Sequence, residues 1–222
     1  MGHSPLDRVD ALANVYASAL ESHLAGGVTT LFGWSMGGLT AWETARILTR
    51  RGVRVNGVVL VDMPAENDTL DRIADLNDSD SLAALFTGVL DLDPDELRRL
   101  KPEARTDLVI SRGRVAGLFP DDMSQAALKR LFAVYAANGR AAKHYAIPSQ
   151  NLPVLLIRPR TEHAAPLPYM PSSGPDDYGW SRYALGGVSL RWVGGGHNSL
   201  LESPYVEEVA AHVGEFLDSR GQ

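Results

Sequence analysis

The eight residues from Leu31 to Gly38 constrain the fold of this chain more than any other stretch. They read LFGWSMGG, with an apolar run before them and the helical pattern TAWETARILTRRG after them. A G-x-S-x-G sequence between a strand and a helix predicts a nucleophile elbow, in which the serine occupies a strained turn. Gly33 and Gly37 are expected to let strand and helix approach without a Cβ clash. This pattern predicts that the Ser35 hydroxyl stands clear of a sheet.

The environment expected around Ser35 favours nucleophilic chemistry. The hydroxyl would lie above the N-terminus of the following helix, where free N–H groups and the helix dipole stabilise a developing negative charge. The backbone N–H of Met36 is the expected oxyanion-hole donor. The alternative is a glycine-rich turn that only joins a strand to a helix.

Alternating patterns predict an α/β fold. A helical periodicity over residues 5–24 precedes the elbow strand, and a second buried strand, Val55–Val61, follows the elbow helix. Strand character returns at residues 153–157 and 188–193, and an amphipathic helix closes the chain. Strands that alternate with helices indicate a parallel sheet with right-handed crossovers.

The stretch between Met63 and Pro148 shows helical patterns and no persuasive strand. Such an insertion between two strands predicts a helical lid, over about residues 63–148. The expected organisation is one domain, residues 1–222, with a core of residues 1–62 and 149–222. A small second domain with its own partner is the alternative to a lid.

Three residues stand where ligands bind in open parallel sheets, beyond the carboxyl ends of the strands. Ser35 follows the first strand, Asp62 the second and His197 the last. The order Ser, acid, His is that of α/β-hydrolases. Asp62 would hold His197 in the right tautomer while His197 takes the proton of Ser35.

The acid of this predicted triad has competitors. Asp62 could instead cap a lid helix, and Glu162, after the third strand, is the main rival. Asp176 and Asp177 in a Pro/Ser/Gly-rich loop are weaker rivals. His197 has the best context of the six histidines, because a glycine turn precedes it.

Composition excludes several classes of function. A net charge of −6 argues against a general nucleic-acid binder. No apolar run reaches the roughly 18 residues of a membrane span, and the N-terminus lacks the features of a signal peptide. The six histidines show no H-x-x-x-H spacing, so no metal site is expected, and the absence of cysteine fits a reducing cytoplasm.

The motifs together resemble the terminal (type I) thioesterase domains of nonribosomal peptide synthetases and polyketide synthases, in the α/β-hydrolase superfamily. The residues that carry the resemblance are GWSMGGL around Ser35, VLVD ending at Asp62, Gly179-Trp180, and GGGHNSLLESP around His197. In that family the histidine usually stands in the sequence Gly-Asp-His. Here Gly196 replaces the aspartate just before His197. Stand-alone editing thioesterases, which tend to take their acid after a later strand, are the alternative.

The resemblance implies that Ser35 attacks a thioester on the phosphopantetheine arm of an acyl or peptidyl carrier protein, and that the chain itself binds no cofactor. Water, or an internal nucleophile that closes a ring, would then release the acyl chain. The lid would shape the acyl pocket, although lid packing explains the same apolar side chains. The candidates for this lining are Leu85, Phe86, Phe119, Phe132 and Tyr135.

The resemblance also implies that strands are missing. Family members carry earlier strands that flank the elbow strand and supply the second oxyanion donor. We therefore expect a separate polypeptide to complete the sheet. Dimerisation through the open edge, or an inactive domain that binds carrier protein or acyl chain without turnover, are the alternatives.

Overall fold

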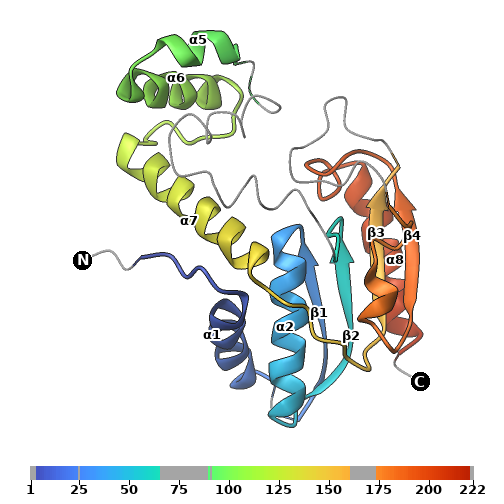
Figure 1. Ribbon diagram of the computed structural model, residues 1–222. Helices are drawn as coiled ribbons and strands as arrows, with labels where there is room; N and C mark the ends of the chain where they lie inside the picture. The colour runs from blue at the N-terminus through green and yellow to red at the C-terminus, as the bar shows by residue number, and fades with distance from the viewer. Residues whose placement is uncertain (1–3, 25, 66–89, 91, 161–173, 221–222) are drawn as a thin grey trace.

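The computed structural model describes residues 4–24, 26–65, 90, 92–160 and 174–220. In this part of the chain four parallel strands form one sheet in the order β1-β2-β3-β4 (Figure 1). Their bounds are Val28–Trp34, Arg54–Val61, Val154–Pro159 and Val188–Val193. The predicted parallel α/β sheet is confirmed.

Helices cover the two faces of the sheet differently. Helices α1 (Val9–Glu21) and α2 (Met36–Arg50) pack on one face, and α8 (Tyr205–Asp218) packs on the other (Figure 1). Because side chains alternate along a strand, β2 supplies Val58 and Leu60 to the first core, and Val59 and Val61 to the second. A strand buried on both faces explains the continuous apolar run of β2.

Strand β1 lies at the edge of the sheet. It pairs with β2 on one side and has no strand on the other side among the described residues. Leu31 packs toward α2 and is 9% exposed, but Phe32 is 46% exposed and Trp34 is 38% exposed on the opposite face. An uncovered apolar edge of this kind is a template for pairing with another strand.

Three helices lie between β2 and β3 in the described part of the chain: α5 (Pro94–Arg99), α6 (Pro102–Val115) and α7 (Gln125–Lys143). They lie on the side of the sheet where the strands end (Figure 1) and share a separate apolar core. The helical character predicted for this stretch is confirmed over its described residues, while residues 66–89 and 91 lie outside them. The division into core and lid stays a prediction.

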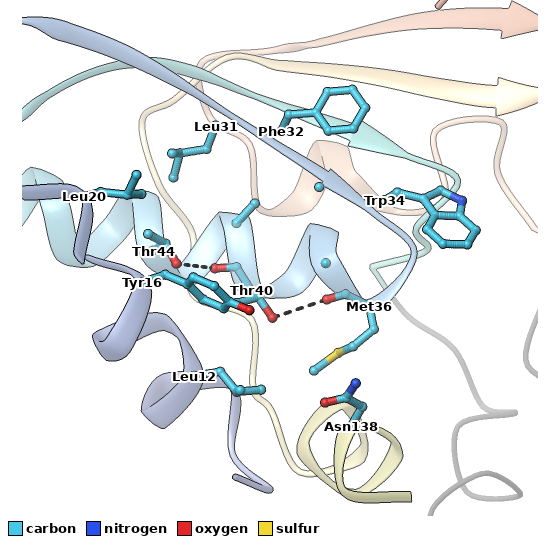
Figure 2. A pocket seen from close by; sticks show the side chains of 13 residues that line it. Leu12, Tyr16, Leu20, Leu31, Phe32, Trp34, Met36, Thr40, Thr44 and Asn138 are labelled. Carbon is cyan, nitrogen blue, oxygen red and sulfur yellow. Dashed lines mark hydrogen bonds between the residues drawn. The ribbon is translucent and has the colours of Figure 1, made fainter. Parts of the chain in front are cut away.

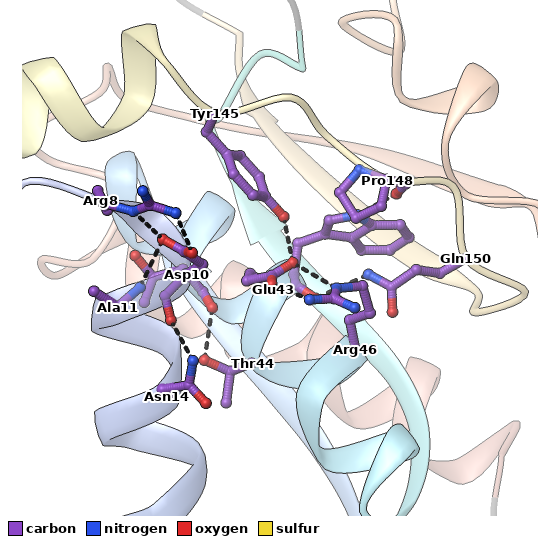
Figure 3. A network of polar contacts seen from close by, with 12 residues as sticks. Arg8, Asp10, Ala11, Asn14, Glu43, Thr44, Arg46, Tyr145, Pro148 and Gln150 are labelled. Carbon is purple, nitrogen blue, oxygen red and sulfur yellow. Dashed lines mark hydrogen bonds and ion pairs between the residues drawn. The ribbon is translucent and has the colours of Figure 1, made fainter.

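A buried polar cluster fixes the end of α7 to α2 (Figure 3). Glu43, which is 2% exposed, accepts hydrogen bonds from Arg46 at 2.5 and 2.8 Å and from the Tyr145 hydroxyl at 2.7 Å. Gln150 donates to the carbonyl of Trp42, whose indole donates to that of Pro148. Paired in this way the buried carboxylate is tolerated, and the return from α7 to β3 is held against the helix that follows Ser35.

One predicted boundary is wrong. The first helix begins at Val9 and not at Pro5, and Arg8 occupies its N-cap without a side-chain hydrogen bond. Residues 5–8 lie outside the helix, so the apolar spacing that begins at Leu6 overstated its length.

Candidate active site

Ser35 occupies a strained turn between β1 and α2. Its φ of 53° and ψ of −135° lie in a region that residues with a Cβ rarely adopt. Its N–H donates to the carbonyl of Val61 at 2.9 Å, which ties the turn to β2. A Cβ on Gly33 would lie 2.2 Å from the carbonyl oxygen of Gly37. Glycine at position 33 is therefore required, as the sequence predicted.

Gly37 is a different case. A Cβ built there would meet no described atom within 4 Å, so the expectation that Gly37 permits close packing is wrong for the described residues. Gly37 instead lines a groove of 540 Å³ that runs between the β1 edge, α1, α2 and α7 (Figure 2). Its walls are mostly apolar and include Tyr16, Phe32, Trp34 and Met36.

Asp62 and His197 form a buried pair. The carboxylate Oδ2 of Asp62 lies 2.7 Å from Nδ1 of His197, and the two residues are 0% and 2% exposed. Asp62 has a φ of 48°, and its N–H donates to the carbonyl of Ile157 on β3. A carboxylate bound to Nδ1 orients an imidazole so that its other nitrogen can act as a base.

The loop after β4 places His197 beside the elbow. The indole of Trp34, the residue before Ser35, donates to the His197 carbonyl at 3.1 Å, and the two rings lie 5.0 Å apart. Gly195 has a φ of 82° and starts the turn, which the Ser199 hydroxyl braces by accepting from the N–H of Gly196. The predicted residues after β1, β2 and β4 are thereby brought to one end of the sheet.

Tyr178 is a site residue that the sequence reasoning missed. Its hydroxyl donates to Oδ1 of Asp62 at 2.9 Å, and it is 9% exposed. Burial, and then the charge of Asp62, raise the pKa of Tyr178, so it remains a protonated donor at neutral pH. The neighbouring pair Gly179-Trp180, noted as part of the resemblance, was the only sequence signal near it.

None of the three competing acids named from the sequence is seen in contact with His197 among the described residues. Glu162 lies outside the described residues. The Asp177 carboxylate accepts hydrogen bonds from the backbone N–H groups of Gly179 and Ser181, so it caps a local turn. Asp176 is exposed. Of the acids the structure describes, Asp62 is the one in contact with His197.

The predicted pocket residues are scattered. Leu85 and Phe86 lie outside the described residues. Phe119 and Phe132 are 8% and 7% exposed and belong to the apolar core shared by α5, α6 and α7, while Tyr135 on α7 is half-buried. Their proposed contact with an acyl chain stays a prediction.

The part of the chain that the structure describes contains neither a candidate metal site nor a candidate membrane span. There, no group of three or more His, Cys, Asp or Glu side chains could hold a metal ion. Among the helices described, none is both long and apolar enough to cross a membrane.

Known proteins resemble parts of this sequence. Over 56 residues the chain is 52% identical to orsellinic acid synthase from Beauveria bassiana, a match covering 24% of this chain and 2% of that protein. Over 112 residues it is 29% identical to polyketide synthase PksR from Bacillus subtilis, covering 50% of this chain and 4% of that protein. The chain thus spans a small fraction of the length of these relatives.

Solved structures share the fold. A four-domain nonribosomal peptide synthetase, AB3403, matches with a TM-score of 0.76 at 22% identity, over 97% of this chain and 16% of that one. The Vlm2 thioesterase domain matches with a TM-score of 0.62 at 22% identity, over 95% and 76%. A family model described as thioesterase domain matches residues 1–217. With the parallel sheet and the strained serine turn, this match places the chain in the thioesterase domain family.

Proposed function

We propose that this chain is a serine thioesterase that releases a peptidyl or polyketide acyl chain from the phosphopantetheine arm of a carrier protein. The observation that carries the proposal is the buried Asp62–His197 pair beside the strained turn of Ser35. The curated relatives named above are synthases, which supports an acyl substrate presented on a carrier protein.

The reaction proceeds in two stages. His197 takes the hydroxyl proton as Ser35 Oγ attacks the thioester carbonyl, and Asp62 stabilises the imidazolium. The tetrahedral intermediate collapses, its C–S bond breaks, and the pantetheine sulfur leaves with the proton from His197. Water or an internal nucleophile then attacks the acyl-enzyme while His197 takes its proton, and release of the acyl chain returns that proton to Ser35.

The developing oxyanion needs backbone donors. Met36 is the first residue of α2, so its N–H has no partner within the helix and supplies one donor. A second donor comes from a segment that pairs with the open edge of β1. The exposed Phe32 and Trp34 and the groove beside them support this completion.

The surroundings of the site fit the same proposal. Helices α5, α6 and α7 lie toward the carboxyl ends of the strands, where a lid shapes the acyl pocket and decides between water and an internal nucleophile (Figure 1). The acyl chain itself is carried by the partner, so the domain works without a bound cofactor. The lack of cysteine supports a place in the cytoplasm.

The test uses an acyl-pantetheine thioester. The chain is incubated with it, quenched in acid and digested, and the peptide that contains Ser35 is examined by mass spectrometry. An acyl adduct on Ser35, with release of free pantetheine thiol, is expected. Ser35→Ala should carry no adduct and lose about 10⁶ in turnover. Binding of the thioester without adduct or thiol release would instead indicate a non-catalytic acyl-binding domain.

A further inference from the structure

The Asp62 carboxylate has a second side-chain partner besides His197. Its Oδ2 contacts His197 Nδ1 at 2.7 Å, and its Oδ1 accepts a hydrogen bond from the Tyr178 hydroxyl at 2.9 Å. Asp62 is 0% exposed, so water cannot replace a lost donor without rearrangement. Loss of one hydrogen-bond donor from a buried carboxylate costs free energy of folding, and the orientation of the carboxylate is no longer fixed.

The backbone around Tyr178 is fastened to the residues that follow Asp62. The carbonyl of Tyr178 accepts from the N–H of Ala65 at 3.0 Å, and the Trp180 indole donates to the carbonyl of Met63 at 2.6 Å. Tyr178 itself has a φ of 53°, which is unusual for a side chain of this size. The segment therefore presents the phenol to Asp62 in one fixed geometry.

Arg158 lies behind Tyr178. The guanidinium carbon of this β3 residue sits 3.6 Å from the centroid of the Tyr178 ring and 4.5 Å from that of Trp192. Its Nη1 donates to the carbonyl of Asp176 at 2.8 Å. Stacking on two rings fixes the guanidinium, and its positive charge strengthens the phenol as a donor.

We propose that Tyr178, supported by Arg158, is a positioning residue for the Asp62–His197 pair. The hydroxyl holds the carboxylate so that Oδ2 faces His197, and it draws part of the negative charge away from that oxygen. The inference rests on the proposed function, in which His197 is the base. Tyr178 acts through Asp62 and does not touch the reacting atoms.

Among the described residues, Asp62, Arg158, Tyr178 and His197 are the charged or titratable groups whose printed contacts form this cluster, and Asp176 and Asp177 directly precede Tyr178 in the chain. Asp62 comes from the end of β2, Arg158 from β3 and His197 from the turn after β4, and Tyr178 lies among them. Trp34 and Trp192 complete the described aromatic surroundings without charge. Substitution at position 178 therefore acts first on Asp62, which the Tyr178 hydroxyl contacts, and through Asp62 on His197.

The matched control is a half-buried tyrosine, Tyr145, that also donates to a buried carboxylate. Tyr145 donates to the Glu43 carboxylate at 2.7 Å, and burial and that hydrogen bond raise its pKa as well. Tyr145→Phe thus removes the corresponding hydroxyl from a tyrosine–carboxylate pair that includes neither Asp62 nor His197. It reports the structural cost alone.

The first readout is kinetic. Active sites are counted with a fluorophosphonate, and thioester hydrolysis is measured against pH. Tyr178→Phe is expected to lower kcat per active site by about 10- to 100-fold, the effect of one hydrogen bond to a charged group. The acidic limb of the rate profile should move to higher pH, because the fuller charge of Asp62 favours the imidazolium. Arg158→Met should move it in the same direction and Arg158→Lys should restore it.

The second readout does not need turnover. The Nδ1 proton of His197 is followed by NMR and assigned by its loss in His197→Gln. Its resonance is expected to shift in Tyr178→Phe and to stay in place in Tyr145→Phe. An unchanged resonance and an unchanged pH profile in Tyr178→Phe would overturn the positioning role. Absence of labelling and turnover in the unsubstituted chain would instead overturn the proposed function, while the NMR comparison still decides the role of Tyr178.

Discussion

The surroundings of Ser35 differ on its two sides in how far the side chains are buried and hydrogen-bonded. Toward β2, β3 and β4 the side chains are buried and paired: Asp62 binds both His197 and Tyr178, and neither Asp62 nor His197 is more than 2% exposed. Toward the β1 edge, Phe32 and Trp34 are exposed beside a groove of 540 Å³. In the mechanism we propose, the acid–base half of the site is preorganised by these contacts, and the oxyanion half would depend on what occupies the groove.

The largest expected effect comes from a substitution in the Asp62–His197 pair. Asp62→Asn keeps the shape of the side chain but removes the charge that stabilises the imidazolium of His197. By analogy with the serine protease triad we expect kcat to fall about 10⁴-fold. Steady-state thioester hydrolysis measures this, with circular dichroism as the control for folding. An unchanged rate would transfer the role of the acid to Glu162.

Substitution of Gly33 and of Gly37 by alanine is expected to have different effects. Gly33→Ala places a Cβ 2.2 Å from the Gly37 carbonyl oxygen, so the turn must move and activity should fall by about 10²-fold. Gly37→Ala meets empty space in a helix and should raise the free energy of unfolding by about 1 kcal/mol. Thermal unfolding and hydrolysis assays test both variants. Equal changes in activity and in stability for the two variants would contradict the difference between crowded Gly33 and Gly37, which lines the groove.

The smallest expected effect concerns the open edge. Phe32 is 46% exposed on β1, and burial of such a side chain contributes about 1.5–3 kcal/mol to an association. If two copies of the chain associate through this edge, the alternative named above, Phe32→Lys should weaken that self-association about tenfold in sedimentation experiments. Val115→Lys is the control, because Val115 is 85% exposed on α6, away from the sheet. Equal association of both variants would show that the β1 edge is not the contact surface.

The sequence predicted the parts of the site that follow from local pattern. Apolar runs and glycine spacing placed Ser35, Asp62 and His197 at strand ends, because the carboxyl ends of parallel strands meet at one edge. Tyr178 could not be found in this way. It reaches Asp62 across more than 100 positions of sequence, and no periodicity encodes that contact.

The predicted lid region shows a second limit of sequence patterns. An apolar side chain on a helix can face a pocket or a neighbouring helix, and the pattern is identical in both cases. Phe119 and Phe132 pack into the core shared by α5, α6 and α7. The need for the second glycine of the motif, Gly37, also could not be predicted. A G-x-S-x-G sequence does not tell whether a neighbouring strand crowds that position.

Reaction of Ser35 with a fluorophosphonate tests the central claim most directly. Intact mass spectrometry and peptide mapping of the folded chain should find one adduct, on Ser35, because the Asp62–His197 pair activates the hydroxyl even with one oxyanion donor. The adduct should be absent in Ser35→Ala and strongly slowed in His197→Gln. Labelling elsewhere, or labelling of Ser35 that is equally fast in His197→Gln, would contradict the assignment of Ser35 as a nucleophile activated by His197.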